Sequence, residues 1–295
     1  MKDPAIRSNR AQCLCALISA SIVAVCVCVG VTINLVTLYD ENFDHMGIRT
    51  FCMFTVNSNI LAGLSMLLCI PYTVDGLRTG YYHLPDWVVV LMHMGVTAVS
   101  LTFLVSLLLL APVKGFYLIF SGSRFFLHGV CPVLSIVTFC CFICSHLVRP
   151  KETPLSLIPV ALYAIVYLVM VVFIGEENGG WNDFYGFATR IPLWISLVSI
   201  MPITYGIALL LRLGHNKCCL NRRAKDAQLY RDAYTGADLR KVIAEMARSR
   251  RRELKLKNVV IPSQIIGYMI ENGGSALDPA EGSRIYLEAY LEEPG

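Results

Sequence analysis

Six long apolar segments constrain the fold of this chain more than any other feature. A transmembrane helix needs about 20 mostly apolar residues, and each segment is near or above that length. Only 16% of the 295 residues are charged, whereas about a quarter are charged in a soluble domain. We therefore predict an all-α, polytopic membrane protein with six transmembrane helices within residues 1–213. The segments cover roughly residues 13–38, 51–72, 87–112, 125–148, 155–174 and 191–213.

The distribution of basic residues predicts the orientation of these helices. Short loops rich in Lys and Arg remain in the cytoplasm. Lys2, Arg7 and Arg10 precede the first span, and a basic stretch beginning at Arg212 follows the sixth. The loops after spans one and five are acidic instead. Because an even number of spans puts both ends of the chain on one side, we expect a protein of the cell membrane with both termini in the cytoplasm.

The twelve cysteines do not indicate a disulfide scaffold or a metal centre. Most of them lie in the middle of apolar spans, where a thiol acts as a small apolar packing group. The pairs Cys13/Cys15 and Cys26/Cys28 each lack a second pair at the spacing of a zinc site. We expect no metal and no other cofactor.

The composition changes after the sixth span, and residues 214–295 are predicted to form a helical cytoplasmic tail. Between Arg212 and Lys257 there are 14 Lys or Arg and 5 Asp or Glu. Apolar residues within this stretch follow helical spacing, which indicates a basic amphipathic helix. They are Leu239, Val242, Ile243 and Met246. Further on, Asp278-Pro-Ala-Glu281 is typical of the capped start of a final helix.

A basic helix beside a bilayer predicts a lipid partner for this tail. Anionic lipid attracts basic residues close to the surface by about 1 kcal/mol each. We therefore expect residues 212–257 to lie on an anionic lipid surface. Nucleic acid is the alternative partner of the Arg248–Arg252 run, but no aromatic residues are interleaved with it. We expect no nucleic-acid partner.

The second span opens with a cluster of polar side chains. Thr55, Ser58 and Asn59 are spaced three and four residues apart and so share one helical face. Polar groups in a membrane helix are costly unless they meet partners within the protein. His128 opens the fourth span, and at 1.5 Å per residue Thr55 and His128 both lie about 6–8 Å below the same membrane boundary.

A histidine beside a hydroxyl is the minimum arrangement for nucleophilic catalysis, because the imidazole accepts the hydroxyl proton. Thr55 is the candidate nucleophile and His128 the candidate base. Asn59 or Asn182 is suited to orient the histidine or to donate to a developing oxyanion. Ser58 and Asp183 are further supporting polar residues. The competing interpretation is structural, since a membrane Thr usually bonds a carbonyl one turn back and a His near a helix end often serves packing.

The loops on the same side add candidates for substrate binding. Lys114, Arg124 and Arg190 are positioned to hold a carboxylate head group while acyl chains extend between the helices. Trp181 and Tyr185 belong to a Gly-rich, aromatic loop after the fifth span. This loop is either an interfacial aromatic belt or a lid over the ends of spans two and four.

Three short patterns resemble the androgen-induced-gene type of integral membrane hydrolases, and their bacterial six-span branch in particular. They are Phe54-Thr55-Val-Asn-Ser58-Asn59, His128-x-x-x-Pro132 and Gly180-Trp181-x-x-x-Tyr185-x-Phe187, and the resemblance covers about residues 15–213. It implies a six-helix fold and hydrolysis of esters between fatty acids and hydroxy fatty acids. The nucleophile and histidine roles of that family fall on Thr55 and His128.

Two functions therefore remain open for this chain. One is an intramembrane lipid-ester hydrolase acting on a fatty-acid ester. The other is a non-enzymatic six-span protein such as a carrier, a lipid-binding protein or a regulatory subunit. The spans lack the mid-depth acidic residue typical of a proton-coupled carrier, which disfavours that version of the second alternative.

Overall fold

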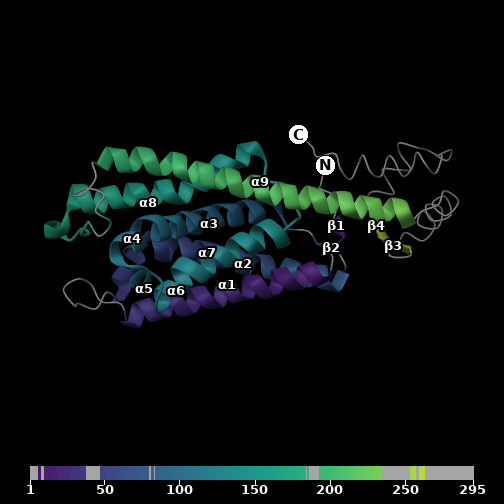
Figure 1. Ribbon diagram of the computed structural model, residues 1–295, viewed down its shortest axis with the longest axis horizontal. Coiled ribbons are helices and arrows are strands. Elements are labelled where there is room, and N and C mark those ends of the chain that lie inside the picture. The colour runs from purple at the N-terminus through teal and green to yellow at the C-terminus, as the bar shows by residue number, and fades with distance from the viewer. Residues whose placement is uncertain are drawn as a thin grey trace.

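The computed structural model is an elongated bundle of helices (Figure 1). It describes residues 6–7, 10–37, 47–79, 81–82, 84–183, 185, 193–233, 253–256 and 259–262. Six of its helical segments are long and apolar enough to cross a membrane, which confirms the predicted multi-pass helical architecture. They are Ala11–Val36, Phe54–Arg78, Asp86–Lys114, Ser123–Phe142, Pro150–Ile174 and Val198–Asn221.

The first, second and sixth spans are each one continuous α-helix. These are α1 (Arg10–Thr37), α2 (Phe54–Thr79) and α9 (Leu193–Ala233). A 3₁₀ turn, η1 (Gly47–Cys52), precedes α2. Two-residue strands β1 (Ile6–Arg7) and β2 (Tyr81–Tyr82) pair in antiparallel fashion at the end of the bundle where α1 begins and α2 ends.

The remaining spans combine α-helix with wider π-helical turns. The third span is α3 (Asp86–Val105), the π-helical η2 (Ser106–Leu110) and α4 (Ala111–Lys114), and the short α5 (Phe116–Ile119) follows it. The fourth is α6 (Ser123–Phe125), η3 (Phe126–Val130), α7 (Cys131–Val137) and η4 (Thr138–Phe142), of which η3 and η4 are π-helical. The fifth is the 3₁₀ helix η5 (Pro150–Leu157), α8 (Ile158–Leu168) and the π-helical η6 (Val169–Ile174), followed by the 3₁₀ turn η7 (Glu176–Asn178).

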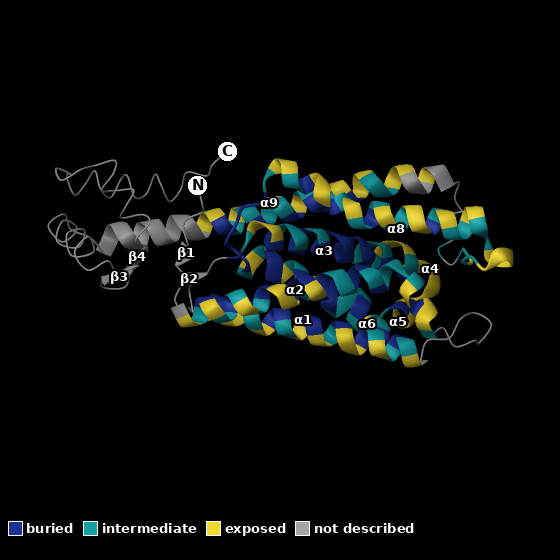
Figure 2. Ribbon diagram, turned by 180° about the vertical axis from the view of Figure 1, so that it is seen from behind, coloured by how far each residue is buried: buried dark blue, intermediate teal, exposed yellow. Residues whose placement is uncertain are grey.

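The third span forms the centre of the bundle. Half of its most apolar window is buried, against 11% for the fifth span, and Figure 2 shows α3 as the dark-blue element among teal and yellow neighbours. Close helix contact here depends on small residues. A Cβ at Gly95 of α3 would lie 3.0 Å from Ala62 Cα of α2, and one at Gly30 of α1 would lie 2.8 Å from Leu127 Cδ2. The fifth span is therefore peripheral, and its apolar side chains suit a lipid environment.

The part of the predicted tail that the structure describes differs from the expectation. The helix of span six extends beyond residue 213, because α9 continues without a break to Ala233. Strands β3 (Glu253–Leu256) and β4 (Val259–Pro262) pair as an antiparallel hairpin within the region predicted to be helical. The predicted amphipathic helix around Leu239 and the capped helix at Asp278 lie outside the described residues.

Candidate functional site

A large apolar cavity lies near the end of the bundle that holds the start of α2, which we call the Thr55 end. Its empty space, including that open at its mouth, is about 770 Å³. Side chains from α2, α3, η2, α8, α9 and the loop after the fifth span form its wall. They are Phe54, Thr55, Leu101, Thr102, Val105, Ser106, Leu110, Val160, Tyr163, Ala164, Tyr167, Tyr185 and Ile200. The described residues of the wall are apolar except for hydroxyl groups, and they include no Lys, Arg, His, Asp or Glu.

Tyr185 closes the cavity over the first residues of α2. The Phe54 N–H donates to its hydroxyl at 3.0 Å, and the hydroxyl also hydrogen-bonds the backbone and side chain of Thr55. The first N–H groups of a helix have no partner within the helix, so a phenol oxygen is well placed there. Burial raises the pKa of Tyr185 above its ordinary value, and the group remains a neutral hydroxyl.

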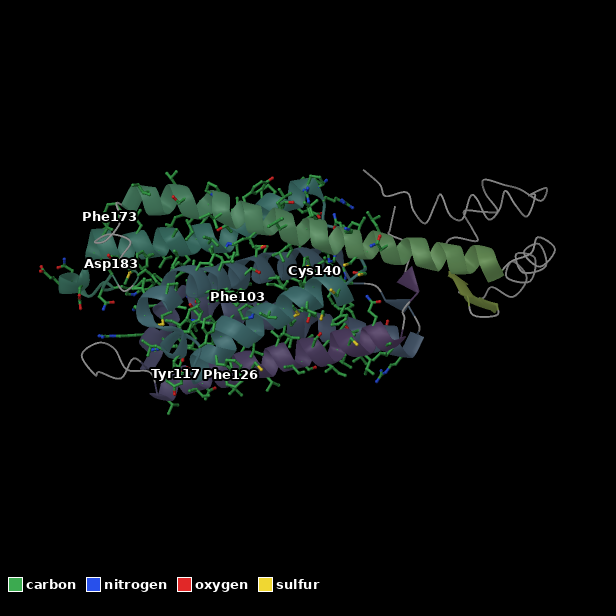
Figure 3. All side chains as sticks on the ribbon, viewed as in Figure 1. Phe103, Tyr117, Phe126, Cys140, Phe173 and Asp183 are labelled. Atoms are coloured by element: carbon green, nitrogen blue, oxygen red, sulfur yellow. The ribbon has the colours of Figure 1, made fainter. Side chains whose placement is uncertain are left out.

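Further aromatic residues pack around Tyr185 and connect it to α8. The Tyr167 ring lies 5.7 Å from that of Tyr185, and Trp181 packs against Tyr163 and Tyr167 at 6.4 and 6.5 Å. The Tyr167 hydroxyl donates to Asp183 Oδ1 at 2.6 Å, and Figure 3 shows Asp183 at this end of the bundle. These contacts place the loop against spans two and five. Its role as a lid stays a prediction.

Two hydroxyl groups of the third span lie deeper in the wall. Thr102 Oγ1 is 3.0 Å from Ser58 Oγ, and Ser58 Oγ also donates to the Thr55 carbonyl at 3.1 Å. Ser106 is only 1% exposed, yet its hydroxyl has no hydrogen-bond partner among the described residues. A buried polar atom without a partner is rare and requires an explanation. Ser106 Oγ is therefore available to a polar atom of a bound molecule.

Asn59 connects the second span to the fourth. Its Nδ2 donates to the Thr55 carbonyl at 2.7 Å and to the Leu127 carbonyl at 2.9 Å. Leu127 belongs to the π-helical turn η3, whose wider geometry leaves carbonyls free to accept from outside the helix. This contact joins the backbone of Thr55 to the residue that precedes His128. The observed role of Asn59 is to hold the two spans together.

His128 is not among the residues that line the cavity. Its ring contacts Phe120 edge-on at 6.5 Å between centroids and hydrogen-bonds the Ile119 backbone. His128 Nδ1 is buried without a partner in the described part of the chain. Asn59 thus connects the backbone of Thr55 to the backbone just before His128. The Thr55 and His128 side chains do not line the same cavity. Their catalytic roles stay predictions.

Two residues of the predicted cationic head-group site, Lys114 and Arg124, do not line the cavity. Lys114 is exposed at the end of α4, and Arg124 Nη1 donates to the Leu118 carbonyl at 3.0 Å. Arg190 lies outside the described residues. Asn182 is exposed in the loop.

Sequence reasoning missed the contribution of α8 and of the end of the third span. Tyr163 and Tyr167 are four residues apart, as are Thr102 and Ser106, and each pair lies on one helical face. This spacing is a signal of a shared polar face, but it does not say that the two faces meet. Only the packing of α8 against α3 brings them to one cavity.

No group of three or more His, Cys, Asp or Glu that could hold a metal ion occurs in the described ranges. No family model, curated protein or solved structure matches this chain. The geometry of the cavity therefore carries the functional argument.

Proposed function

We propose that this membrane protein binds a lipid whose acyl chain occupies the cavity between α2, α3, α8 and α9. The observation that carries the proposal is an apolar cavity within membrane-spanning helices, with hydroxyl groups at the Thr55 end. Apolar walls with a few polar groups are typical of ligand sites. Inside a bilayer, an acyl chain is the abundant apolar ligand.

The polar groups of the wall favour an uncharged head group. The hydroxyls of Thr55, Tyr163 and Tyr185 are neutral, although Tyr163 donates its proton to the Cys52 carbonyl at 2.7 Å. The nearby Asp183 carboxylate disfavours an anion. The unpartnered Ser106 hydroxyl provides a second polar contact, which suits an ester or hydroxyl oxygen of the ligand. A monoacylglycerol or another neutral single-chain ester fits these features better than a free fatty acid.

Filling the cavity tests the proposal directly. Ala164 of α8 lines the cavity, whereas Ala161 on the preceding turn does not. We expect Ala164→Phe to weaken binding of a photoreactive monoacylglycerol by at least about tenfold, or about 1.4 kcal/mol. Ala161→Phe is the matched control and should leave binding unchanged. Binding is measured with protein in lipid nanodiscs, and mass spectrometry locates the labelled peptides.

Equal labelling of both variants and wild type would exclude the cavity as the site. A fatty acid that competes better than a monoacylglycerol would contradict the neutral head group while leaving the acyl-chain site intact. Labelled peptides are expected from α3 and α8.

Ester cleavage is the second candidate function, favoured by the Thr55 side chain in the cavity wall beside Tyr185. In this reaction Thr55 Oγ attacks the ester carbonyl, the alcohol leaves with a proton, and water then releases the acyl group from Thr55. A base must accept the Thr55 proton, and His128 is the predicted one. Its ring would have to approach the cavity for this step.

Isosteric replacement separates the two candidates. Thr55→Val removes the hydroxyl and keeps the shape, so a hydrolase should lose at least about 100-fold in cleavage while lipid labelling persists. Thr102→Val is the control, since Thr102 lines the same cavity without being a candidate nucleophile. Undiminished cleavage by Thr55→Val would end the nucleophile assignment, and loss of cleavage in His128→Gln would support the base.

We further propose that both termini lie in the cytoplasm, with the Thr55 end outside. The basic bias around Arg10 and Arg212 supports this orientation. Residues 212–257 would then meet anionic lipid of the inner leaflet. Fusions of a periplasmic or cytoplasmic reporter to each terminus test the orientation, and an active periplasmic reporter at either end would contradict it.

A further inference from the structure

The opposite end of the bundle, which we call the His146 end, has a second cluster of buried polar residues. His146 lies between the fourth and fifth spans and is 2% exposed. Its Nδ1 is 3.3 Å from Asp86 Oδ1 at the start of α3, and its Nε2 is 3.2 Å from Glu152 Oε2 in η5. One imidazole ring thus bridges two carboxylates from different spans.

Ion-pair distances from both ring nitrogens to carboxylates favour a proton on each nitrogen. An ionised carboxylate only accepts hydrogen bonds, and a neutral imidazole has a single N–H. Only the imidazolium can donate to Asp86 and Glu152 together, and such charge-assisted bonds are roughly twice as strong as neutral ones. A neutral ring would leave one nitrogen lone pair facing a carboxylate oxygen.

The other charged groups around His146 are consistent with a bound proton. Arg149 Nη2 is 4.0 Å from Asp86 Oδ2, while Arg212 of α9 is directed to Thr153 Oγ1 at 3.0 Å. Two carboxylates therefore face His146 with one cation at the edge of the cluster. Asp86 has 53% of its side chain exposed, so protons can reach the site from water.

Residues of α9 hold the backbone of the same segment. His215 is fully buried, and its Nε2 lies 2.8 Å from the His146 carbonyl while its Nδ1 lies 2.9 Å from the Phe139 carbonyl. Asn216 bonds both the N–H and the carbonyl of Val148 at 2.9 Å. The segment from His146 to Val148 is therefore tied to α9 by its backbone and to α3 and η5 by the His146 ring.

His93 provides an internal comparison. Its Nε2 faces the Ala208 carbonyl at 2.9 Å and its Nδ1 faces the Ser156 hydroxyl at 2.8 Å. A hydroxyl can donate, so a neutral His93 with its proton on Nε2 satisfies both contacts. The contacts of His146 and His93 thus favour different protonation states for the two rings.

We propose that His146 is a proton-binding site that latches α3, η5 and α9 together at this end of the bundle. With the proton bound, His146 contacts both Asp86 and Glu152. The segment between spans four and five is then held against α3 and η5. Loss of the proton as the pH rises removes one donor and the positive charge that lies between the Asp86 and Glu152 carboxylates. The segment then loosens. Helices α3 and α9 also contribute to the cavity wall. The latch contacts these two helices at the His146 end, whereas the cavity lies at their Thr55 end.

Nitrogen-15 NMR of histidine-labelled wild-type protein in nanodiscs tests the protonation state. Each histidine is assigned by the signal lost in its single His→Gln variant. At about pH 6 we expect both His146 nitrogens to be protonated and His93 to have one N–H, on Nε2. A His146 ring with a single protonated nitrogen at this pH would overturn the proposal.

Hydrogen–deuterium exchange tests the mechanical consequence. We expect protection factors of residues 143–152, corrected for intrinsic exchange, to fall at least about threefold between about pH 6 and pH 8.5 in the wild type. In His146→Gln the protection should be low at both pH values, because Gln cannot donate to both carboxylates. His93→Gln serves as the control and should keep the pH dependence. An equal pH dependence in wild type and His146→Gln would refute the latch.

Discussion

The two ends of this helical bundle use polar residues in opposite ways. At the Thr55 end, neutral hydroxyls surround an empty apolar cavity, and Ser106 has no partner among the described residues. At the His146 end, both ring nitrogens of two buried imidazoles have polar contacts. His146 contacts two carboxylates, and His215 contacts two backbone carbonyls. At the Thr55 end, a buried hydroxyl has no partner among the described residues. At the His146 end, the polar groups bond to one another and join helices.

This difference indicates how a mostly apolar chain separates the proposed binding site from the contacts that stabilise the fold. Charged groups are costly in a membrane helix unless they are paired. At the His146 end, charged residues lie together and join neighbouring helices. Uncharged hydroxyls cost less when unpaired, so a cavity lined by them is tolerated. The cavity should therefore accept substitutions that the opposite end does not.

The largest expected effect is at His215. His215→Ala removes the ring that stacks on Phe139 at 4.4 Å and the ring N–H that donates to the buried Phe139 or His146 carbonyl. Each unsatisfied buried group costs about 1–3 kcal/mol, so we expect a loss of about 3 kcal/mol in the free energy of unfolding. Thermal unfolding in detergent measures it. Thr55→Ala is the matched change at the other end and should lower the free energy of unfolding by less than about 1 kcal/mol. Equal losses in the two variants would contradict the proposed difference between the two ends.

A smaller loss is expected where α2 and α3 meet between the two ends. Gly95→Ala places a Cβ 3.0 Å from Ala62 Cα, and since backbone cannot rotate away, the helices must separate at about 1–3 kcal/mol. Gly206→Ala in α9 meets nothing within 4 Å and should be neutral or stabilising by up to about 1 kcal/mol. Chemical unfolding of both variants measures the difference. A destabilised Gly206→Ala would show that helix contact is not the cause.

The pH response should distinguish the two ends. Burial raises the pKa of Tyr185, so the neutral form persists below and through its ordinary pKa of about 10. Its contribution to stability is fully present below that value and is lost only as the pH rises through the raised pKa. Monoacylglycerol binding should therefore change less than twofold between about pH 6 and pH 8, while protection of residues 143–152 falls. Binding that weakens in parallel with this loss of protection would show that the ends are coupled.

The smallest effect is expected at Ser106. Ser106→Ala removes a buried hydroxyl without a partner, so the ligand-free protein should gain about 1 kcal/mol or less in stability. Ser100→Ala is the control in the same span, because it breaks a 2.7 Å bond to the Val96 carbonyl and should lose stability slightly. Binding of a monoacylglycerol should weaken in Ser106→Ala relative to a hydrocarbon chain without oxygen. An unchanged ratio of monoacylglycerol affinity to hydrocarbon affinity in Ser106→Ala would exclude Ser106 as a ligand contact.

Much of the architecture was predictable because one property dominates it. A run of about 20 apolar residues in a bilayer must satisfy its backbone groups internally, and the helix does so without reference to the rest of the chain. The six spans agree with the predicted segments to within several residues at their ends. The helix of span six continues to Ala233, because polar residues after Arg212 are compatible with a helix that leaves the membrane. Composition therefore does not mark the end of this helix.

The candidate site was predictable only in part. Helical spacing placed Thr55, Ser58 and Asn59 on one face, and their contacts with the third and fourth spans agree with a buried polar face. It did not predict that α8 packs against α3, which brings Tyr163 and Ser106 to the same cavity as Thr55.

The sequence by itself determined that this protein is a set of membrane-length helices with polar residues near their ends. Local properties were sufficient for that, because hydropathy and helical spacing depend on neighbours in the chain. Only the tertiary structure decided which polar residues meet. It directed the Thr55 hydroxyl to a cavity and the His128 ring to Phe120, and it brought His146 between Asp86 and Glu152. These outcomes depend on how the helices rotate and approach one another, which the pattern of a single helix does not specify.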